Sequence, residues 1–301
     1  MKFAIAPIRP LITIGVISAA LLGTPASAAA DQPAATYWHT RILSTTTHPW
    51  QFGSRSNRYS LVQQQIVESW TATDGKSWYG YRELGTRPKS AADKKAWQRD
   101  GAPTEWSKSI DGKTMKLSTE PSEGRVGLVP NRTDPTGRNR TPYELAGQRL
   151  TYDEVQRLPA DPNGLKDWLT KAARTGRIPE GSIGSWVTGT LPHILYTLPA
   201  PKQVRSAAYR ALLTMPGVRS AGNAKDTLGR SGTTVLIDTT TRQTNNVISS
   251  HTRLIVDTST MVLLSQHQTM SANGKPSVKS SNETMVEVGW TDSQPTVPAQ
   301  P

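Results

Sequence analysis

The chain of 301 residues contains no cysteine. Disulfide bonds and thiol catalysis are therefore excluded, and so is the lipid-modified cysteine that anchors bacterial lipoproteins. A chain of this length can bury most of its apolar surface without covalent cross-links. The absence of cysteine is thus compatible with an exported protein.

Long hydrophobic runs are also scarce. The run at residues 11–22 is shorter than the roughly 20 residues that span a bilayer. Lys2 and Arg9 flank it on the amino-terminal side, and Ala26, Ser27 and Ala28 follow in the small-x-small pattern of a signal-peptidase site. The pattern predicts a signal peptide over 1–28, cleaved after Ala28, with an uncleaved anchor as the alternative.

Residues 29–35 are expected to form a flexible leader. The mature product is expected to be soluble, in the cell envelope or outside the cell.

Acidic residues are outnumbered, since the formal net charge is +12. Loss of Lys2 and Arg9 with the signal peptide leaves +10, because residues 1–28 contain no carboxylate. Such a surface attracts anionic lipids and wall polymers, although a generic solvated surface is an alternative interpretation. Nucleic acid is not expected as a partner of an exported chain without a binding motif.

Catalytic motifs are missing as well. The sequence has no G-x-S-x-G, S-x-x-K, H-E-x-x-H or phosphate-binding loop. Its five histidines show no close metal-ligand spacing. We therefore expect no catalytic residue, metal or cofactor. The carboxylates in predicted strands are interpreted as solvent-facing or as partners of Arg82, Arg242 or Arg253; they are Glu68, Glu83, Asp238 and Glu287.

The sequence allows two arrangements of one pair of histidines. His251 and His267 lie on the two arms of a predicted hairpin. A loop with an odd number of residues would pair them directly, whereas an even loop would put them on opposite faces. The even loop is favoured, because two-residue hairpin turns are the commonest.

Hydrophobic periodicity predicts strands, then helices, then strands. Early strands are expected at 36–44, 59–72 and 77–84, and late ones at 233–241, 246–257, 261–270 and 282–290. A short helix at 91–99, a hairpin at 104–119 and a long loop at 119–142 lie between. This order favours a single α+β domain over 36–291, with helices on one face of an antiparallel sheet. The Pro-rich segment 292–301 is predicted to be a disordered tail.

Local signals delimit the middle helices. Thr151 and Glu154 form a capping-box pattern, and Asp161 precedes Pro162 as a helix N-cap. Pro192 is expected to kink or divide an apolar stripe over 182–198. Another helix is predicted from Pro201 to Met215, where Pro-Gly ends it.

Two stretches, "LPADPNGLKDWL" and "AAYRALLTMPGVRSAGNAKDTLGRSGTTV", resemble a family of actinobacterial exported proteins. Asp226, Gly229, Arg230 and Gly232 match that family's D-x-x-GRxG turn. The resemblance covers about residues 158–265 and implies no reaction.

The chain is more remotely similar to the half-barrel fold of the lipoprotein carrier LolA and the sensor RseB, notably in "RLIVDTSTMVLL". This similarity implies a curved antiparallel sheet with helices packed on its concave face, next to an apolar concavity.

The aromatic residues are mostly Trp and Tyr, with nine Trp and eight Tyr but only two Phe. Trp and Tyr combine an apolar body with a polar tip, which suits a half-wet cavity, although ordinary core packing is the alternative. The candidate ligand contacts are Trp38, Ile66, Trp70, Trp78, Trp186, Leu191, Ile194 and Leu195.

The leading hypothesis is an exported, non-enzymatic protein that holds a hydrophobic or amphipathic ligand, such as a lipid, or a partner segment. The ligand would lie between the early aromatic strands and residues 182–198. The alternatives are a cell-envelope hydrolase and a regulatory sensor that contacts a membrane protein. A deep apolar pocket favours a carrier, whereas a filled cavity with an exposed apolar patch favours a sensor.

Overall fold

The computed structural model describes residues 35–110, 112–129, 143–243 and 246–300. The chain divides into two units, Met1–Ala30 and Asp31–Pro301. The predicted signal peptide, its cleavage site after Ala28 and most of the predicted leader lie outside the described residues. Everything below concerns the second unit.

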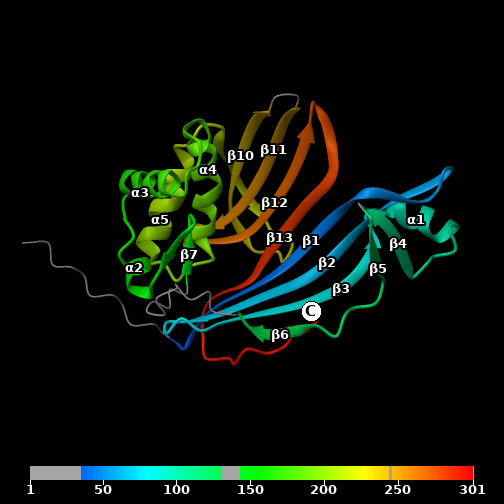
Figure 1. Ribbon diagram of the computed structural model, residues 1–301, viewed down its shortest axis with the longest axis horizontal. Helices are drawn as coiled ribbons and strands as arrows, with labels where there is room; N and C mark the ends of the chain where they lie inside the picture. Colours follow the sequence, from blue (N-terminus) through cyan, green and yellow to red (C-terminus); the bar gives the residue numbers. More distant parts are fainter. Residues whose placement is uncertain (1–34, 111, 130–142, 244–245, 301) are drawn as a thin grey trace, which may run out of the picture. The chain divides into compact units, whose positions relative to one another are not determined.

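The central feature is a nine-stranded antiparallel sheet with the order β6-β3-β2-β1-β13-β12-β11-β10-β9 (Figure 1). Strands β6 and β9 form its edges, so the sheet is open over the described residues. Its strands are β1 (Tyr37–Ser54), β2 (Asn57–Ala72), β3 (Ser77–Pro88), β6 (Arg125–Leu128), β9 (Val218–Lys225), β10 (Ser231–Gln243), β11 (Asn246–Asp257), β12 (Val262–Ala272) and β13 (Lys275–Thr291).

Two meanders build this sheet, one early and one late in the chain. Pairing of β1 with β13 joins them, and Trp38 lies directly opposite Trp290 in that register. Because the helices are inserted between the two meanders, the strand–helix–strand order of the sequence yields one continuous sheet. The predicted α+β class with antiparallel strands is confirmed at this level.

The inserted helices begin where local signals predict. They are α2 (Tyr152–Gln156), α3 (Pro162–Thr175), the 3₁₀ turn η1 (Glu180–Ser182), α4 (Ile183–Thr190), the 3₁₀ segment η2 (Leu191–Leu195) and α5 (Lys202–Leu213). Thr151 and Glu154 form both bonds of the capping box. Asp161 accepts a hydrogen bond from the Gly164 N–H at 2.7 Å. Pro192 lies where α4 gives way to η2, because its ring cannot continue the helical ladder.

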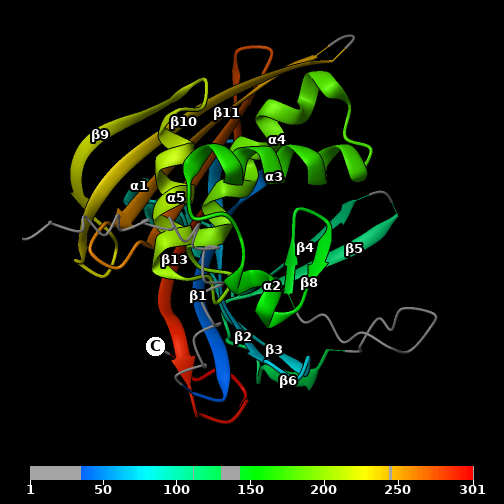
Figure 2. The same cartoon turned by 90° about the vertical axis from the view of Figure 1, so that its left-hand side faces the viewer.

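The main core lies between these helices and one face of β10–β13 (Figure 2). Leu191, Ile194 and Leu195 are fully buried in it. Their strand neighbours in the cluster alternate along the strands, as one face of a sheet requires; they include Val235, Ile237, Leu254, Val256, Leu263 and Met285.

Replacing Leu212 in α5 with alanine is expected to lower the free energy of unfolding by about 2–5 kcal/mol, the usual effect of truncating a buried leucine. Leu212 has no exposed surface. Urea denaturation measures the change. A loss below about 0.5 kcal/mol, as at surface positions, would contradict the packing of α5.

A second, smaller cluster lies at the far end of β1 and β2. It includes Phe52, Tyr59, Leu61, Ala96, Trp106 and Leu117. Helix α1 (Ala91–Arg99), capped by Ser90, covers it together with the hairpin of β4 (Glu105–Ile110) and β5 (Lys113–Ser118). A further hairpin, β7 (Tyr143–Leu145) and β8 (Gln148–Leu150), contributes to the main core instead.

His48 borders this smaller cluster and predicts a pH dependence. It is buried against Trp50 and Phe52, and its Nε2 atom has no partner among the described residues. Burial lowers the pKa of His48 below its usual 6.5, so the unfolded chain binds the proton more readily than the folded one. The contribution of His48 to stability is therefore present above pH 6.5 and is lost as pH falls.

The expected loss is up to about 1.4 kcal/mol per pH unit between the two pKa values. Urea denaturation of the wild type and of His48→Phe at about pH 7.5 and about pH 5.5 isolates this residue, since the other histidines are common to both chains. Parallel pH profiles for the two chains would contradict the assignment.

Three expectations from the sequence need correction. The strand expected at 36–44 continues to Ser54, because a register shift between Thr47 and Gln51 accommodates Pro49. Within the expected loop 119–142, Arg125–Leu128 forms β6 on β3, while residues 130–142 lie outside the described part. The segment 292–300, expected to be disordered, packs against β1 and β3.

Candidate functional site

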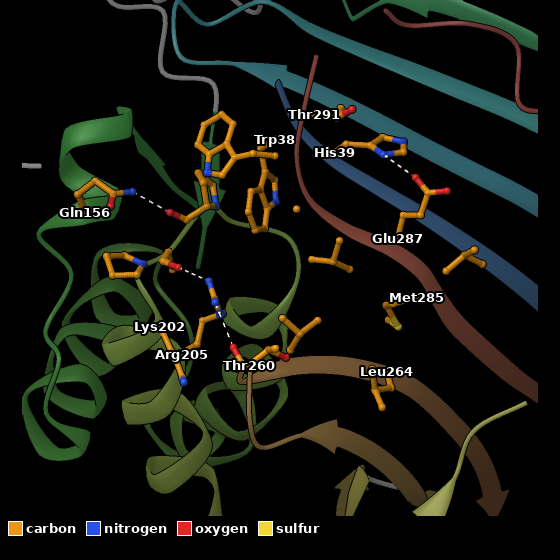
Figure 3. A pocket seen from close by; sticks show the side chains of 18 of the residues that line it. Trp38, His39, Gln156, Lys202, Arg205, Thr260, Leu264, Met285, Glu287 and Thr291 are labelled. Carbon is orange, nitrogen blue, oxygen red and sulfur yellow. Dashed lines mark hydrogen bonds and ion pairs between the residues drawn. The ribbon is translucent and has the colours of Figure 1, made fainter. Parts of the chain in front are cut away.

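A pocket of about 750 Å³ lies where the sheet meets the helical segment. Strands β1, β12 and β13 form one side, and α2 with residues 199–205 forms the other (Figure 3). Its volume falls within the range of small-molecule sites, which is about 300–1,000 Å³.

Aromatic rings form one wall of this pocket. Trp38 and Trp290 meet edge to face, with ring centroids 5.8 Å apart, and Tyr152 packs on Trp290 at the same separation. The Trp38 Nε1–H donates to the backbone oxygen of Tyr196 at 3.2 Å. The wall therefore presents a largely apolar surface whose orientation is held by both the sheet and the helical segment.

Two cationic side chains also line the pocket, at the start of α5. Lys202 is exposed at the start of α5. Arg205, one turn later, donates to the backbone oxygens of Ala200 and Thr260, and its Nε atom has no partner among the described residues. Burial lowers the pKa of Arg205 from its usual value. Because Lys202 and Arg205 are cationic and both line the pocket, this end can receive an anionic group.

Arg230 also lines the pocket, but its guanidinium is engaged. It pairs with Asp226 and donates to the backbone oxygens of Leu264 (3.2 Å) and Met285 (2.7 Å). Asp226 also accepts from the N–H groups of Leu228 and Arg230, both at 2.9 Å. Through Arg230, the D-x-x-GRxG segment thus holds the β9–β10 turn against β12 and β13.

Glycine at position 232 of this turn permits a close approach of the backbone. A Cβ atom there would lie 2.7 Å from the backbone oxygen of Val256. A larger residue would therefore push β10 away from β11.

The structure distributes the predicted site residues over several places. Trp38 lines the pocket, and Trp186 is partly buried against the main core. Leu191, Ile194 and Leu195 are core residues without exposed surface. Trp70 lies opposite both His39 and Trp78, so it is on the other face of the sheet from Trp38.

Ile66 shares the face of Trp70, and both are almost fully buried. The eight residues therefore do not line one cavity. The pocket instead uses Trp290, Tyr152, Lys202 and Arg205, which local patterns did not single out. Pairing of the first and last strands brings Trp290 to Trp38, and periodicity within one segment carries no information about such pairing.

Of the carboxylates interpreted as solvent-facing or paired with predicted arginine partners, Glu287 and Asp238 are exposed, whereas Glu68 is not. Glu68 is buried, accepting from Arg41 Nη1 at 2.7 Å and lying 3.1 Å from His39 Nε2. Glu287 lies 3.4 Å from the other nitrogen of His39. The hydroxyl of Tyr81 donates to Glu83 at 2.9 Å. No arginine expected as a partner takes part in these contacts.

The two hairpin histidines do not pair directly, but they lie on the same face of the sheet, so the favoured expectation of opposite faces is wrong. His267 lies opposite Arg253, and His251 opposite Thr269. A register shift between Ile255 and Val256 separates the pairing near the turn from the pairing further along, so the parity of the loop alone does not determine the faces. His251 lies 2.7 Å from Asp238 on β10. In the part of the chain that the structure describes, no three metal-binding side chains form a cluster.

No helix in the described residues is long and apolar enough to cross a membrane.

Comparisons with known proteins identify no family for this chain. No protein-family model and no curated protein matches the chain. One solved structure, which concerns lipid–protein interactions in lipovitellin, aligns with 89% of this chain at 10% identity and a TM-score of 0.21. This chain spans 26% of that one, and a likeness at this level bears on neither fold nor function.

Proposed function

We propose that this chain is an exported, non-enzymatic binding protein that holds an amphipathic, lipid-like ligand in the pocket between β13 and α5. The observation that carries the proposal is the composition of that pocket. The aromatic rings of Trp38, Trp290 and Tyr152 line it together with the cationic side chains of Lys202 and Arg205. An apolar chain with an anionic head group complements both parts.

The proposed architecture is a half-barrel similar to LolA and RseB, with the sheet curved around the helices. Contacts of the β9–β10 turn support it. Arg230 reaches the backbone oxygen of Met285 in β13, and Thr227 bonds Thr284 at 2.8 Å. In a flat sheet β13 would lie roughly 14 Å from β10, because neighbouring strands are about 4.8 Å apart. The hydrogen bonds from the β9–β10 turn to β13 are much shorter than that distance. They favour a sheet that curves, so that its β9–β10 end approaches β13.

Binding energy would come mainly from the aromatic wall. Removing about 60 Å² of apolar contact costs about 1.5 kcal/mol, which is roughly a tenfold loss of affinity. The head group would contribute orientation, because Lys202 is exposed and its charge is partly screened by solvent. Arg205 is held by two backbone oxygens, which fixes its position at the pocket.

An anionic envelope surface is the proposed place of action. The module of α1, β4–β5 and the adjoining ends of β1–β3 carries exposed cations, none of which forms an ion pair with another described residue. Attraction of about 1 kcal/mol per cation close to an anionic lipid surface supports this placement. These cations are Arg55, Arg58, Arg87, Lys89, Lys94, Lys95, Arg99, Lys113 and Lys116.

A regulatory sensor is the second candidate. Side chains of η2 fill the space between the helices and the late strands. An apolar patch of Tyr79, Leu128 and Val129 is exposed at the β6 edge, with Leu128 59% accessible. Such a patch supports contact with another protein, which a carrier would not require.

We expect Trp290→Ala to weaken binding of a long-chain fatty acid about tenfold. Tryptophan fluorescence titrated with palmitate measures it, and circular dichroism verifies folding. The matched control is Trp78→Ala, which removes an indole from the other face of the sheet. Lys202→Ala should weaken binding severalfold, whereas Lys171→Ala, an exposed change on α3, should not. Equal affinities for Trp290→Ala and the wild type would refute the proposed site.

A further inference from the structure

The segment 292–300 forms a strap across the face of β1–β3 that carries Trp70. Thr36 donates its N–H and hydroxyl to Asp292 at 2.9 and 2.7 Å. The Tyr37 hydroxyl donates to Gln294 Oε1 at 3.3 Å, and Arg41 donates to the backbone oxygen of Ala299 at 2.7 Å. The strap has neither helical nor strand structure, and the hydrogen bonds from Thr36, Tyr37 and Arg41 hold it near both ends.

Two residues of the strap that lie three positions apart are withdrawn from solvent. Pro295 is half-buried, Thr296 and Val297 are exposed, and Pro298 is buried. A polyproline II segment has three residues per turn, so residues three apart share one edge. The two prolines of this Pro-x-x-Pro sequence therefore form the edge that faces the sheet.

The sheet offers a slot for that edge. Gly80 lies on β3, and a Cβ atom there would be 3.0 Å from Pro298 Cγ and 3.1 Å from Trp70 Cζ3. Without a side chain at this position, the proline ring fits against the indole. Gly124 gives similar room to Val297, whose Cγ1 would lie 2.9 Å from a Cβ atom.

Aromatic side chains surround the slot. Tyr37 and Trp78 meet edge to face with ring centroids 5.5 Å apart, and Trp70 stacks on His39 at 4.9 Å. Aromatic-lined grooves that receive Pro-x-x-Pro segments are a recurring mode of peptide recognition, because a polyproline segment loses little conformational entropy on binding.

We propose that this face of β1–β3 is a recognition groove for proline-rich Pro-x-x-Pro segments, and that residues 295–298 occupy it as a tethered competitor of such a segment in a partner protein. The tether gives the strap an effective concentration in the millimolar range. A partner segment binds when it contacts the groove more extensively than the strap, or when the strap is displaced. This site is separate from the ligand pocket, and its test does not depend on the proposed function.

The test uses the full chain and a fluorescein-labelled peptide with the sequence of residues 292–300, DSQPTVPAQ. Fluorescence anisotropy measures peptide binding to the wild type and to Pro295→Ala/Pro298→Ala, whose strap has lost its buried edge. We expect at least tenfold tighter binding to the double variant. Thr296→Ala, at an exposed strap position, should behave as the wild type.

Two further variants keep the test decisive. Gly80→Leu, added to the strap variant, should abolish peptide binding because the side chain fills the slot. If the strap variant does not fold, Asp292→Ala/Gln294→Ala releases the strap at its exposed end instead. Absence of peptide binding to every folded strap variant would overturn the proposal. A concentration-dependent dimer that the peptide dissociates would also overturn it, by assigning the groove to the strap of a second copy.

Discussion

Asp226→Ala is expected to lower the free energy of unfolding by about 3–5 kcal/mol, the usual effect of removing one partner of a buried ion pair. The Asp226 side chain has no exposed surface, and it holds both the turn N–H groups and the Arg230 guanidinium. Its loss leaves a partly buried cation bonded only to backbone oxygens. It also releases the β9–β10 turn from β12 and β13.

Urea denaturation checks this expectation, with Asp167→Ala as the control. Asp167 is an exposed carboxylate on α3, where a change within about 0.5 kcal/mol is expected. Adding Arg230→Met to Asp226→Ala should recover part of the loss, because no unpaired charge remains. A single variant as stable as the control would show that the turn does not lock the sheet.

Glu68→Ala should have an effect of similar size, about 3–5 kcal/mol. Glu68 is buried beneath the strap and accepts from Arg41, whose other nitrogen bonds Ala299. The second carboxylate oxygen of Glu68 lies 3.1 Å from the Nε2 atom of His39. Without the carboxylate, Arg41 keeps a charge in a site that is mostly shielded from water.

The neighbouring Glu287 supplies the matched control. It contacts the same His39, but its side chain is 60% exposed. Exposed pairs contribute about 0–1 kcal/mol, so Glu287→Ala should change stability by less than about 1 kcal/mol. Equal losses for the two glutamates in urea denaturation would mean that burial does not govern this cluster.

Helix boundaries could be predicted from the sequence because their causes are local. Ser90, Thr151 and Asp161 each accept hydrogen bonds from N–H groups within three residues. Pro192 interrupts the helix within the turn that contains it, where α4 gives way to η2. These signals depend on a few consecutive residues, and the structure confirms each of them.

The faces of the sheet could not be predicted in the same way. Trp38 and Trp70 are both aromatic strand residues, yet the register puts one in the pocket and the other under the strap. The alignment of distant strands decides this, and one register shift moves a whole set of side chains to the other face. His251 and His267 illustrate the same effect across a bulge.

The strap is a third case. Its composition predicts disorder because it cannot form a core by itself. Its contacts are with residues more than 200 positions earlier in the sequence, namely the hydrogen bonds from Thr36, Tyr37 and Arg41 and the approach of Pro298 to Gly80. A glycine within a strand signals close approach of another group, although the sequence alone does not say which group approaches.

Native mass spectrometry of the protein purified from its own host tests the central claim most directly, namely that the pocket binds an amphipathic ligand. We predict a species heavier than the polypeptide by the mass of a lipid-like molecule. That species should be lost in Val288→Trp, whose side chain would occupy the pocket beside Trp290. A folded wild type that carries no added mass, and that binds no lipid when titrated, would contradict the account.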